Sequence, residues 1–490
     1  MRLTASDIYS YFRPSKCDLR VYLKHCGAPE SPPGLFEEVV LRLGESHEKY
    51  HLASFQSFVD LREGTREERR RATLESVNAD VDVIYQPAFN GQLILGEKLC
   101  DIHGDPDFLV RQGDGYAIRD SKIARRISAK DHPEILLQLE LYGWLYEQAL
   151  GRPPLDLQVH SGTGEIVSFP YCGGGEALAR LDDISQIKGV TTEPYSPVGV
   201  SKCVGCGFRS LCWDRANRTQ DVALVSGLDQ GLALALNNIG IRTVPEFLTA
   251  FSEESLAQFQ RPWGKGTQRV GKKARMILLA ARALITGKEI LLEIPKVPDH
   301  PNYVMFDLEG LPPQIDDVGK IYLWGLQVYG QKPGRFLPAT SGFGPNGDRE
   351  GWERFLENVQ GIFDEYGDLP IVHWHHYERV HLDVYMERHG DPRGIAARVR
   401  ENLFDMLPIV QKSIVLPLPS YSLKAVEKYV GFKRTQDEYG GDWAMAKYIE
   451  ATETEDEGLR REVMEQILTY NKEDLEATWA VLVWLKGKIT

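Results

Sequence analysis

The sequence predicts an α/β protein of three successive regions, and three observations support this prediction. At 490 residues the chain is too long for a single core. Its 42% apolar and 26% charged residues are typical of soluble globular proteins. Cysteines lie near both ends of residues 1–218, residues 219–294 have a largely helical pattern, and a new α/β pattern begins at a proline-rich linker that opens residues 295–490. We expect one domain in each region.

The composition also bounds where the protein works. No apolar run is long enough to span a bilayer, and the first seven residues lack the apolar segment of a signal peptide. We therefore expect a cytoplasmic protein without membrane partners, whose seven cysteines are reduced or bound to metal. The net charge of −13 does not by itself indicate a nucleic-acid-binding protein, although carboxylates that hold metal ions contribute to this total.

The first region alternates between helix and strand patterns, as a small α/β core requires. The predicted elements are a helix over 35–58, strands over 92–100, 101–110 and 115–122, and a helix over 133–150. His47 lies on the first helix, and Gln138 and Tyr142 share a face of the last one because they are four residues apart.

Acidic residues stand at the predicted ends of two neighbouring strands. Asp105 and Asp107 follow one strand, and Asp120 ends the next. Mg²⁺ and Mn²⁺ prefer oxygen ligands, so carboxylates that converge at strand ends are suited to hold such an ion. Asp120 and Lys122 are two residues apart and should point to the same face of the strand. Asp120 can then bind the metal while Lys122 orients or deprotonates the attacking water.

These residues, in their order along the chain, resemble the RecB-like branch of the PD-(D/E)XK nuclease superfamily, which implies a restriction-endonuclease-like fold. The residues that carry the resemblance are His47, Asp107, Asp120, Lys122, Gln138 and Tyr142. The resemblance implies that the first three bind metal and that the lysine acts as catalytic base or electrostatic stabiliser. The glutamine and the tyrosine would contact DNA or support the site. Asp105 is the alternative to Asp107.

Four cysteines form a pattern that suits a metal centre. They are Cys17, Cys203, Cys206 and Cys212. Four thiolates suit either zinc or an iron–sulfur cluster, and the spacing does not separate the two. One N-terminal cysteine with a distant triplet resembles the iron–sulfur RecB-like nucleases, which implies a [4Fe–4S] cluster that joins the two chain ends of the domain. We expect the remaining three cysteines to be buried small apolar residues, namely Cys26, Cys100 and Cys172.

The middle region has two candidate nucleic-acid-binding features. Segments 225–228 and 236–241 resemble a helix-hairpin-helix element, in which backbone amides contact phosphates, and a plain helical linker is the alternative. A basic run over 261–275 contains no acid, and a solvated surface is its alternative interpretation. The candidate nucleic-acid-binding residues within it are Arg269, Lys272 and Lys273.

The last region begins with an apolar strand that ends in Asp307 and Glu309. The predicted strands are 303–310 and 321–329. The two acids are two residues apart, so they face the same side and could share a metal ion. Far downstream, Tyr470 and Asp474 lie one helical turn apart.

This order resembles the ribonuclease H-like DEDD exonucleases, especially the YprB-like group. In that family four acids hold two metal ions and the tyrosine positions the water. Asp307, Glu309 and Asp474 match three of the acids, and Tyr470 matches the tyrosine. The fourth position is taken by Glu378, where the family usually has aspartate. Further candidates are Asp405, His373, His375 and His376.

Together the resemblances imply a metal-dependent nuclease that hydrolyses DNA, at single strands or ends, in repair or processing. Mg²⁺ or Mn²⁺ would serve catalysis, and the [4Fe–4S] cluster would serve the structure. One alternative is a nucleic-acid-binding scaffold with two degenerate catalytic folds, and another is a zinc-containing ribonuclease that acts through the C-terminal site alone. RNA is thus an alternative partner to DNA. The chain has no helicase motif, so any unwinding would need a separate helicase.

Overall fold

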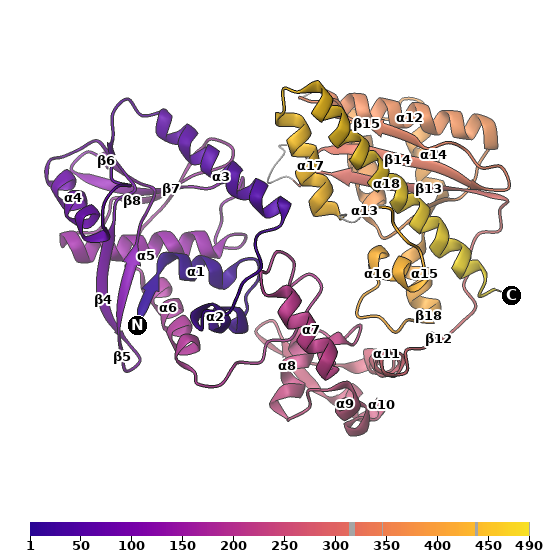
Figure 1. The fold of residues 1–490 in the computed structure, drawn as a ribbon, viewed down its shortest axis with the longest axis horizontal. Coiled ribbons are helices and arrows are strands. Elements are labelled where there is room, and N and C mark those ends of the chain that lie inside the picture. The colour runs from indigo at the N-terminus through magenta and orange to yellow at the C-terminus, as the bar shows by residue number, and fades with distance from the viewer. Residues whose placement is uncertain (313–318, 345, 437–439, 490) are drawn as a thin grey trace. The chain divides into compact units, whose positions relative to one another are not determined.

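A computed structural model describes residues 1–312, 319–344, 346–436 and 440–489 (Figure 1). The chain divides into two compact units. The first comprises Met1–Ser196 and Val200–Cys212, and the second comprises Pro197–Gly199 and Trp213–Thr490. None of the described helices is both long and apolar enough to cross a bilayer.

The first unit contains a six-stranded and a three-stranded sheet. In spatial order the larger sheet is β2 (Val59–Asp60), β3 (Val83–Tyr85), β6 (Phe108–Gln112), β7 (Gly115–Ser121), β8 (Asp156–His160) and β9 (Ile166–Phe169). The smaller is β1 (Arg2–Thr4), β5 (Lys98–Gly104) and β4 (Phe89–Leu95). The helices are α1 (Ala5–Phe12), α2 (Asp18–His25), α3 (Leu35–Ala53), α4 (Arg66–Asn78), α5 (Pro133–Leu150) and α6 (Gly175–Gly189), and α7 (Arg209–Thr219) begins in this unit.

Helix α5 holds the two sheets together, because it packs against strands of both. Its bounds follow from local chemistry. Pro133 occupies the start, where a missing N–H costs nothing, and Gly151 ends the helix in the left-handed conformation. The buried side chains of Leu139 and Leu145 join the core of the unit. The predicted helix over 133–150 is confirmed.

The predicted strand over 92–100 is wrong in its bounds, because it spans the turn of a hairpin. Gly96 has φ +56°, and the chain reverses there between β4 and β5. The predicted strand over 101–110 is also two strands, β5 and β6. Pro106 cannot donate to a ladder and lies in the break between them. As a result Asp107 precedes β6, and the antiparallel pairing of β6 with β7 still places it beside the end of β7.

The second unit begins with short elements and continues into a larger sheet. The first part comprises η1 (Val222–Leu224), α8 (Gln230–Asn238), α9 (Val244–Ala250), α10 (Glu253–Gln258), β10 (Gln260–Trp263), β11 (Gly266–Arg269), η2 (Gly271–Lys273), α11 (Ala274–Thr286) and β12 (Ile290–Leu291). The prediction of helices throughout this part is wrong for β10 and β11, which form an antiparallel hairpin. Pro262 and Gly264 are poor helix formers, which favours the hairpin.

A five-stranded sheet organises the rest of the second unit. In spatial order it is β15 (Leu337–Thr340), β14 (Ile321–Gly330), β13 (Asn302–Gly310), β16 (Ile371–His373) and β17 (Leu403–Asp405). The remaining elements are α12 (Gly347–Tyr366), α13 (Tyr377–His389), α14 (Ile395–Asn402), α15 (Met406–Ser413), β18 (Ile414–Val415), α16 (Leu423–Tyr429), α17 (Gly441–Glu453) and α18 (Glu457–Lys486).

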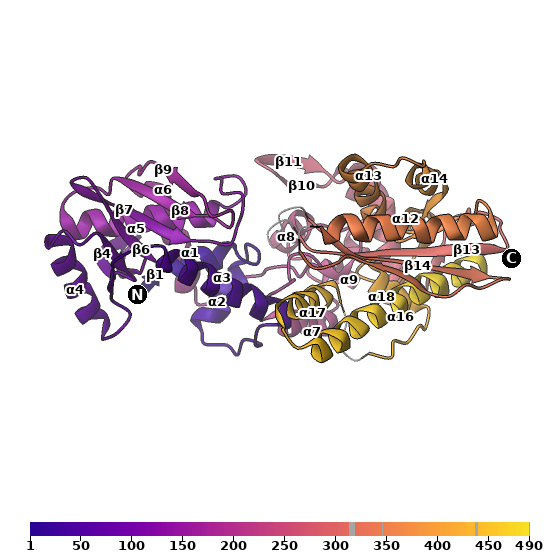
Figure 2. The ribbon, with the colours of Figure 1, turned by 90° about the horizontal axis from the view of Figure 1, so that it is seen from above.

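The central strand β13 sends alternate side chains to two different cores. Phe306 and Leu308 belong to the core that α12 covers. Met305 belongs to the core that α18 covers, on the opposite face of the sheet (Figure 2). Because the alternation has a period of two, Asp307 and Glu309 lie on the α18 face.

Candidate metal centres

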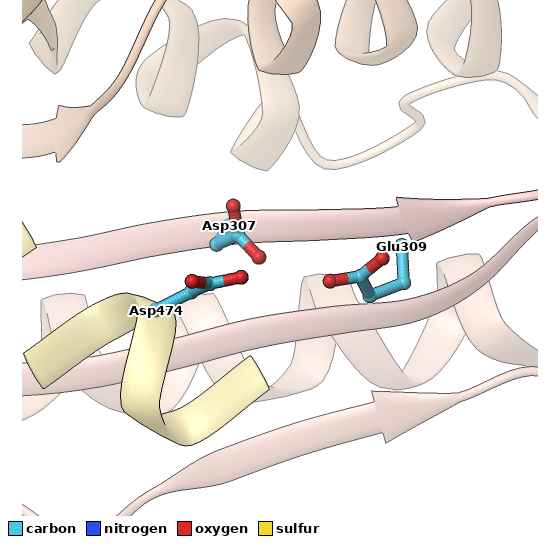
Figure 3. Close-up of side chains that lie close together, drawn as sticks. All are labelled: Asp307, Glu309 and Asp474. Carbon is cyan, nitrogen blue, oxygen red and sulfur yellow. The ribbon is translucent and has the colours of Figure 1, made fainter. Parts of the chain in front are cut away.

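Three carboxylates from β13 and α18 converge in the second unit. One oxygen from each of Asp307, Glu309 and Asp474 lies within 4.8 Å of the other two. Figure 3 shows the three groups pointing toward one another. In the described part of the chain, no other set of three or more histidine, cysteine, aspartate or glutamate ligands meets this closely. An all-oxygen set of this kind suits Mg²⁺ or Mn²⁺.

The three acids repel one another in a poorly solvated place. Burial and the charge of Asp474 raise the pKa of Asp307 well above its usual value, and the same two causes raise the pKa of Glu309. A divalent cation would relieve this repulsion, so the electrostatics of the site favour cation binding.

Two cations already face these acids. Lys424 from α16 and Arg434 each form an ion pair with Asp474. Arg434 also makes two hydrogen bonds of 2.8 and 2.7 Å to the buried carboxylate of Glu427, which holds the guanidinium in place. Sequence reasoning missed Lys424 and Arg434, because a lysine or arginine outside a motif carries no local signal of its partner.

Asn471 connects α18 to the strand that carries the acids. Its Nδ2 donates to Asp307 Oδ2 at 2.7 Å, and its buried Oδ1 has no hydrogen-bond partner in the described chain. Gly325 of β14 lies directly opposite Asp307. A Cβ at Gly325 would come 1.8 Å from Asn471 Oδ1, so only glycine leaves room for this amide. An unpaired acceptor beside three carboxylates fits a hydrated metal ion.

The other candidates of this domain lie around the three acids. Tyr470 is buried, with Lys424 Nζ 4.5 Å from its ring centroid. Glu378 is not part of the convergent group, and its Oε2 lies 3.2 Å from His373 Nδ1. After burial and the charges of Asp474 and Glu309, the charge of Glu378 also contributes to the raised pKa of Asp307.

Asp405 and the histidine segment form a neighbouring arrangement. Asp405 Oδ1 accepts from the backbone N–H of His375 at 2.9 Å and from that of Leu407 at 3.1 Å, so it caps α15. β16 ends at His373, and His375 follows with φ +75°. His373, His376 and Asp405 help to line a pocket of about 470 Å³.

The first unit brings its acids together through the β6–β7 pairing. The backbone N–H of Asp107 donates to Asp120 Oδ1 at 3.1 Å, and the N–H of Ser121 donates to Asp107 Oδ2 at 2.7 Å. Lys122 Nζ lies 3.0 Å from Asp120 Oδ2, on the same face as the sequence predicts. Burial lowers the pKa of Lys122, but the charges of Asp120 and Asp107 outweigh this effect and raise it above its usual value. Lys122 is therefore an ammonium ion at neutral pH.

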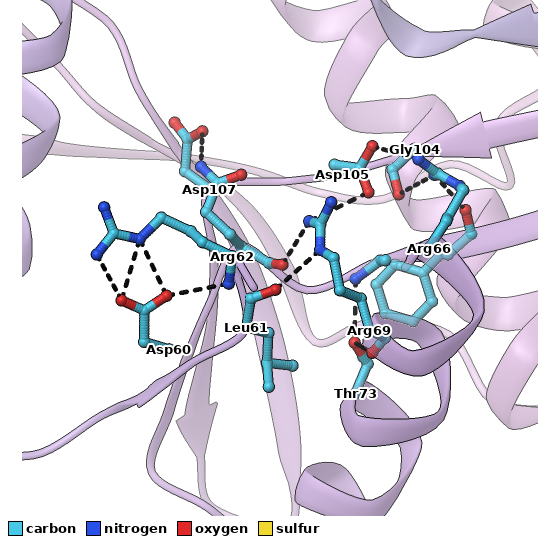
Figure 4. Close-up of polar contacts among 12 residues, drawn as sticks. Asp60, Leu61, Arg62, Arg66, Arg69, Thr73, Gly104, Asp105 and Asp107 are labelled. Atoms are coloured by element: carbon cyan, nitrogen blue, oxygen red, sulfur yellow. Dashed lines mark hydrogen bonds and ion pairs between the residues drawn. The ribbon is translucent and has the colours of Figure 1, made fainter. Parts of the chain in front are cut away.

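Asp105 has a different role from Asp107. Its carboxylate pairs with Arg66 at 2.7 Å and with Arg69 at 3.4 Å, which ties α4 to the segment before β6 (Figure 4). These ion pairs point Asp105 toward α4, whereas Asp107 contacts Asp120 across the β6–β7 pair. Of these two acids, Asp107 is therefore the one that lies beside Asp120.

His47 lies in a stack of three imidazoles. The His160 ring lies between His47, at 4.3 Å, and His51, at 3.9 Å. The His47 Nε2 atom is 3.2 Å from the His160 backbone oxygen. Burial lowers the pKa of His51 to about 3 and that of His160 to about 4, so both are neutral. In the described chain, His47 does not converge with Asp107 and Asp120 within 4.8 Å.

Glu48 is a neighbour of the acids that sequence reasoning missed. It accepts from Tyr85 Oη at 2.7 Å and from Gln86 Nε2 at 2.9 Å, and the same Gln86 amide lies 3.3 Å from Asp107 Oδ1. The sequence offers one signal for Glu48, because it directly follows the candidate ligand His47 on α3. On α5, Gln138 Nε2 donates to Tyr142 Oη at 2.9 Å.

The four predicted cluster cysteines lie in the same part of the first unit. Three of them pack around Leu19, Leu23 and Phe208; these are Cys17, Cys206 and Cys212. Cys203 is buried, and all four cysteines are free thiols. Burial, together with the charges of Cys17 and Cys203, raises the pKa of Cys206. The prediction that the other cysteines are buried is confirmed for Cys100 and wrong for the exposed Cys26 and Cys172.

Comparisons with known proteins bear on the C-terminal domain. Residues 304–486 match the family model of the RNase_H superfamily, so this part of the chain is a ribonuclease H-like domain. No curated protein matches the chain. A solved structure described as "Crystal structure of SSO0001" is 13% identical, over 43% of this chain and 85% of that one, with a TM-score of 0.24.

Gly325→Ala should displace the Asn471 amide from Asp307 and weaken metal binding about 10- to 100-fold, as loss of a partner of a metal ligand does. Mn²⁺ binding would be titrated by electron paramagnetic resonance in a chain that also carries Asp120→Ala, which removes the other candidate site. Gly361→Ala is the matched control, since a Cβ there meets no atom within 4 Å. Equal Mn²⁺ affinity in the two variants would contradict a role for Asn471.

Asp307→Asn should raise the thermal unfolding midpoint in EDTA by a few degrees, because it removes one of three mutually repelling charges. The raised pKa of Asp307 means that falling pH protonates this group in the folded chain before it does so in the unfolded chain. The increase in the unfolding midpoint caused by Asp307→Asn should therefore be larger at pH 8 than at pH 5. The exposed Asp299→Asn is the control. A lower midpoint in Asp307→Asn would show that the charge stabilises the fold.

Proposed function

We propose that this chain is a metal-dependent nuclease that hydrolyses phosphodiester bonds of DNA, at single strands or ends, in repair or processing. The observation that carries the proposal is the convergence of Asp307, Glu309 and Asp474 inside a ribonuclease H-like domain. Hydrolysis of nucleic acid is the chemistry that this domain type suggests. The preference for DNA over RNA and the role in repair rest on the sequence resemblance.

In the C-terminal site the three converging acids would hold Mg²⁺ or Mn²⁺, with Glu378 as the fourth acid. The metal ion would stabilise developing negative charge and activate water. Among the chain's own residues, Tyr470 would position the water through its hydroxyl. Lys424 and Arg434 would face the phosphate with positive charge while they hold Asp474.

The first unit would carry a second site of the PD-(D/E)XK type. Asp107 and Asp120 would bind the metal ion together with His47, and Lys122 would stabilise the transition state. The short contact of Lys122 with Asp120 supports this assignment. The protonated state of Lys122 favours the electrostatic role over that of a base. Gln138 and Tyr142 would support the site or contact DNA.

The four cysteines would ligate a [4Fe–4S] cluster that closes the first unit. The assignment of iron and sulfur rather than zinc rests on the sequence resemblance to the iron–sulfur RecB-like nucleases, because four thiolates suit either metal centre. A separate helicase would supply any unwinding, and we expect the protein to act in the cytoplasm.

Digestion of end-labelled single-stranded DNA and RNA with Mn²⁺ tests the function. The anaerobically purified chain should cut DNA. Asp307→Asn should lower the cleavage rate at the C-terminal site, and Lys122→Ala should lower that at the first-unit site, each on the order of 100-fold or more. Asp299→Asn and the exposed Lys130→Ala are the charge-matched controls.

The pattern of losses separates the alternatives. Loss in Asp307→Asn alone would assign the chemistry to the C-terminal site and leave the first unit a binding role. Cleavage of RNA but not of DNA would favour the ribonuclease. No cleavage by the unmodified chain would favour the scaffold.

A cluster should give the anaerobic protein a broad absorption band in the blue and about four irons per chain. Cys206→Ser should lower both the absorption and the iron content, because it removes one ligand. The exposed Cys172→Ser should change neither. A colourless protein with one zinc per chain would instead support the zinc-containing alternative.

A further inference from the structure

The hairpin of β10 and β11 carries an aromatic side chain at its tip. Trp263 pairs with Gly266, which leaves Gly264 and Lys265 as a two-residue turn. Gly264 has φ +57°, as the first position of a type II′ turn requires. Trp263 is 57% exposed, although large aromatic side chains normally contribute to cores. Figure 2 shows the two strands as a short ribbon of their own.

The Trp263 ring has one close cationic neighbour, and more than half of the side chain is exposed. Arg261 lies two residues earlier on β10, on the same face, and its guanidinium is 4.5 Å from the ring centroid. The residue opposite Trp263 on β11 is Gly266, which has no side chain to cover the ring. The contact with Arg261 therefore supports the indole, and its exposed surface is left for a ligand.

The hairpin packs closely against α8. Arg261 is only 5% exposed and pairs with Asp229, the N-cap residue of that helix, at 3.0 Å. The backbone of β10 lies so close to α8 that a Cβ at Gly231 would be 2.6 Å from the Pro262 carbonyl oxygen. A ligand that stacks on Trp263 would thus meet a surface whose orientation is set in advance, which lowers the entropic cost of binding.

The sequence segment that carries Trp263 is strongly basic in a chain of net charge −13. Residues 260–275 contain no aspartate or glutamate. The exposed cations in this segment are Lys265, Arg269, Lys272, Lys273 and Arg275. Such a cluster attracts a polyanion, and an aromatic platform among cations suits a strand whose bases are unpaired.

We propose that Trp263 is a stacking platform for an unpaired base of single-stranded nucleic acid, whose phosphates the surrounding cations contact. The proposal rests on the proposed function for the identity of the polymer, and it adds a binding site outside both candidate metal centres. Stacking requires a base face and not a particular sequence or sugar. The platform therefore accepts DNA and RNA strands alike.

Fluorescence anisotropy in EDTA, with the full chain and labelled oligonucleotides, tests this site without cleavage. Trp263→Ala should weaken binding of a thymidine single strand on the order of 10-fold, the loss of one stacked base. Trp263→Phe should retain most of the affinity. Leu291→Ala removes a similarly exposed apolar side chain, 53% exposed, and should change nothing.

Two further measurements distinguish stacking from charge. With an abasic strand of equal length, Trp263→Ala and the unmodified chain should bind equally, because no base is present to stack. Lys272→Ala should lower the salt dependence of binding by about 0.7 in the log–log slope, whereas Trp263→Ala should leave that slope unchanged.

Equal affinity of Trp263→Ala and the unmodified chain for the thymidine strand would overturn the platform. So would an equal loss on the abasic strand. These outcomes are independent of cleavage, so the nuclease proposal can stand while this site fails, and the reverse.

Discussion

The mutual repulsion of three carboxylates, two on β13 and one on α18, is the constraint on which the C-terminal domain depends. Asp307 and Glu309 must share a face because they are two residues apart, and α18 adds Asp474 to the same place. Such a group is unfavourable in a poorly solvated position unless cations offset it. Lys424 and Arg434 do so on the Asp474 side. The packing of α16 and of the segment after it against α18 is thus tied to the electrostatics of the site.

In the first unit, the charges of only two neighbouring acids have to be offset. Asp107 and Asp120 accept hydrogen bonds from backbone N–H groups across the β6–β7 pair, and Lys122 adds a full positive charge. Peptide dipoles that the sheet already fixes in place need no reorganisation when charge develops nearby. The two units therefore pair clustered acids with lysine or arginine, but one uses a helix against a strand and the other uses two adjacent strands.

The acidic net charge and a nucleic-acid substrate are compatible because the charges are segregated. The acids of the two candidate metal centres are grouped together, while the exposed cations of residues 260–275 have no acid beside them in the sequence. Arg261 differs from the exposed cations, since its pairing with Asp229 supports the Trp263 ring. Local charge and aromatic exposure, and not the total charge, describe what this surface can bind.

The sequence by itself determined features that depend on near neighbours: the extent of α5, set by Pro133 and Gly151, and the common face of Asp307 and Glu309. Periodicity and capping act within a few residues, so they can be recognised without the fold. Only the tertiary structure decided which distant side chains complete each centre. Asn471 reaches Asp307 across 164 positions of sequence, and no local pattern encodes such a pairing because it arises from the packing of a helix on a sheet.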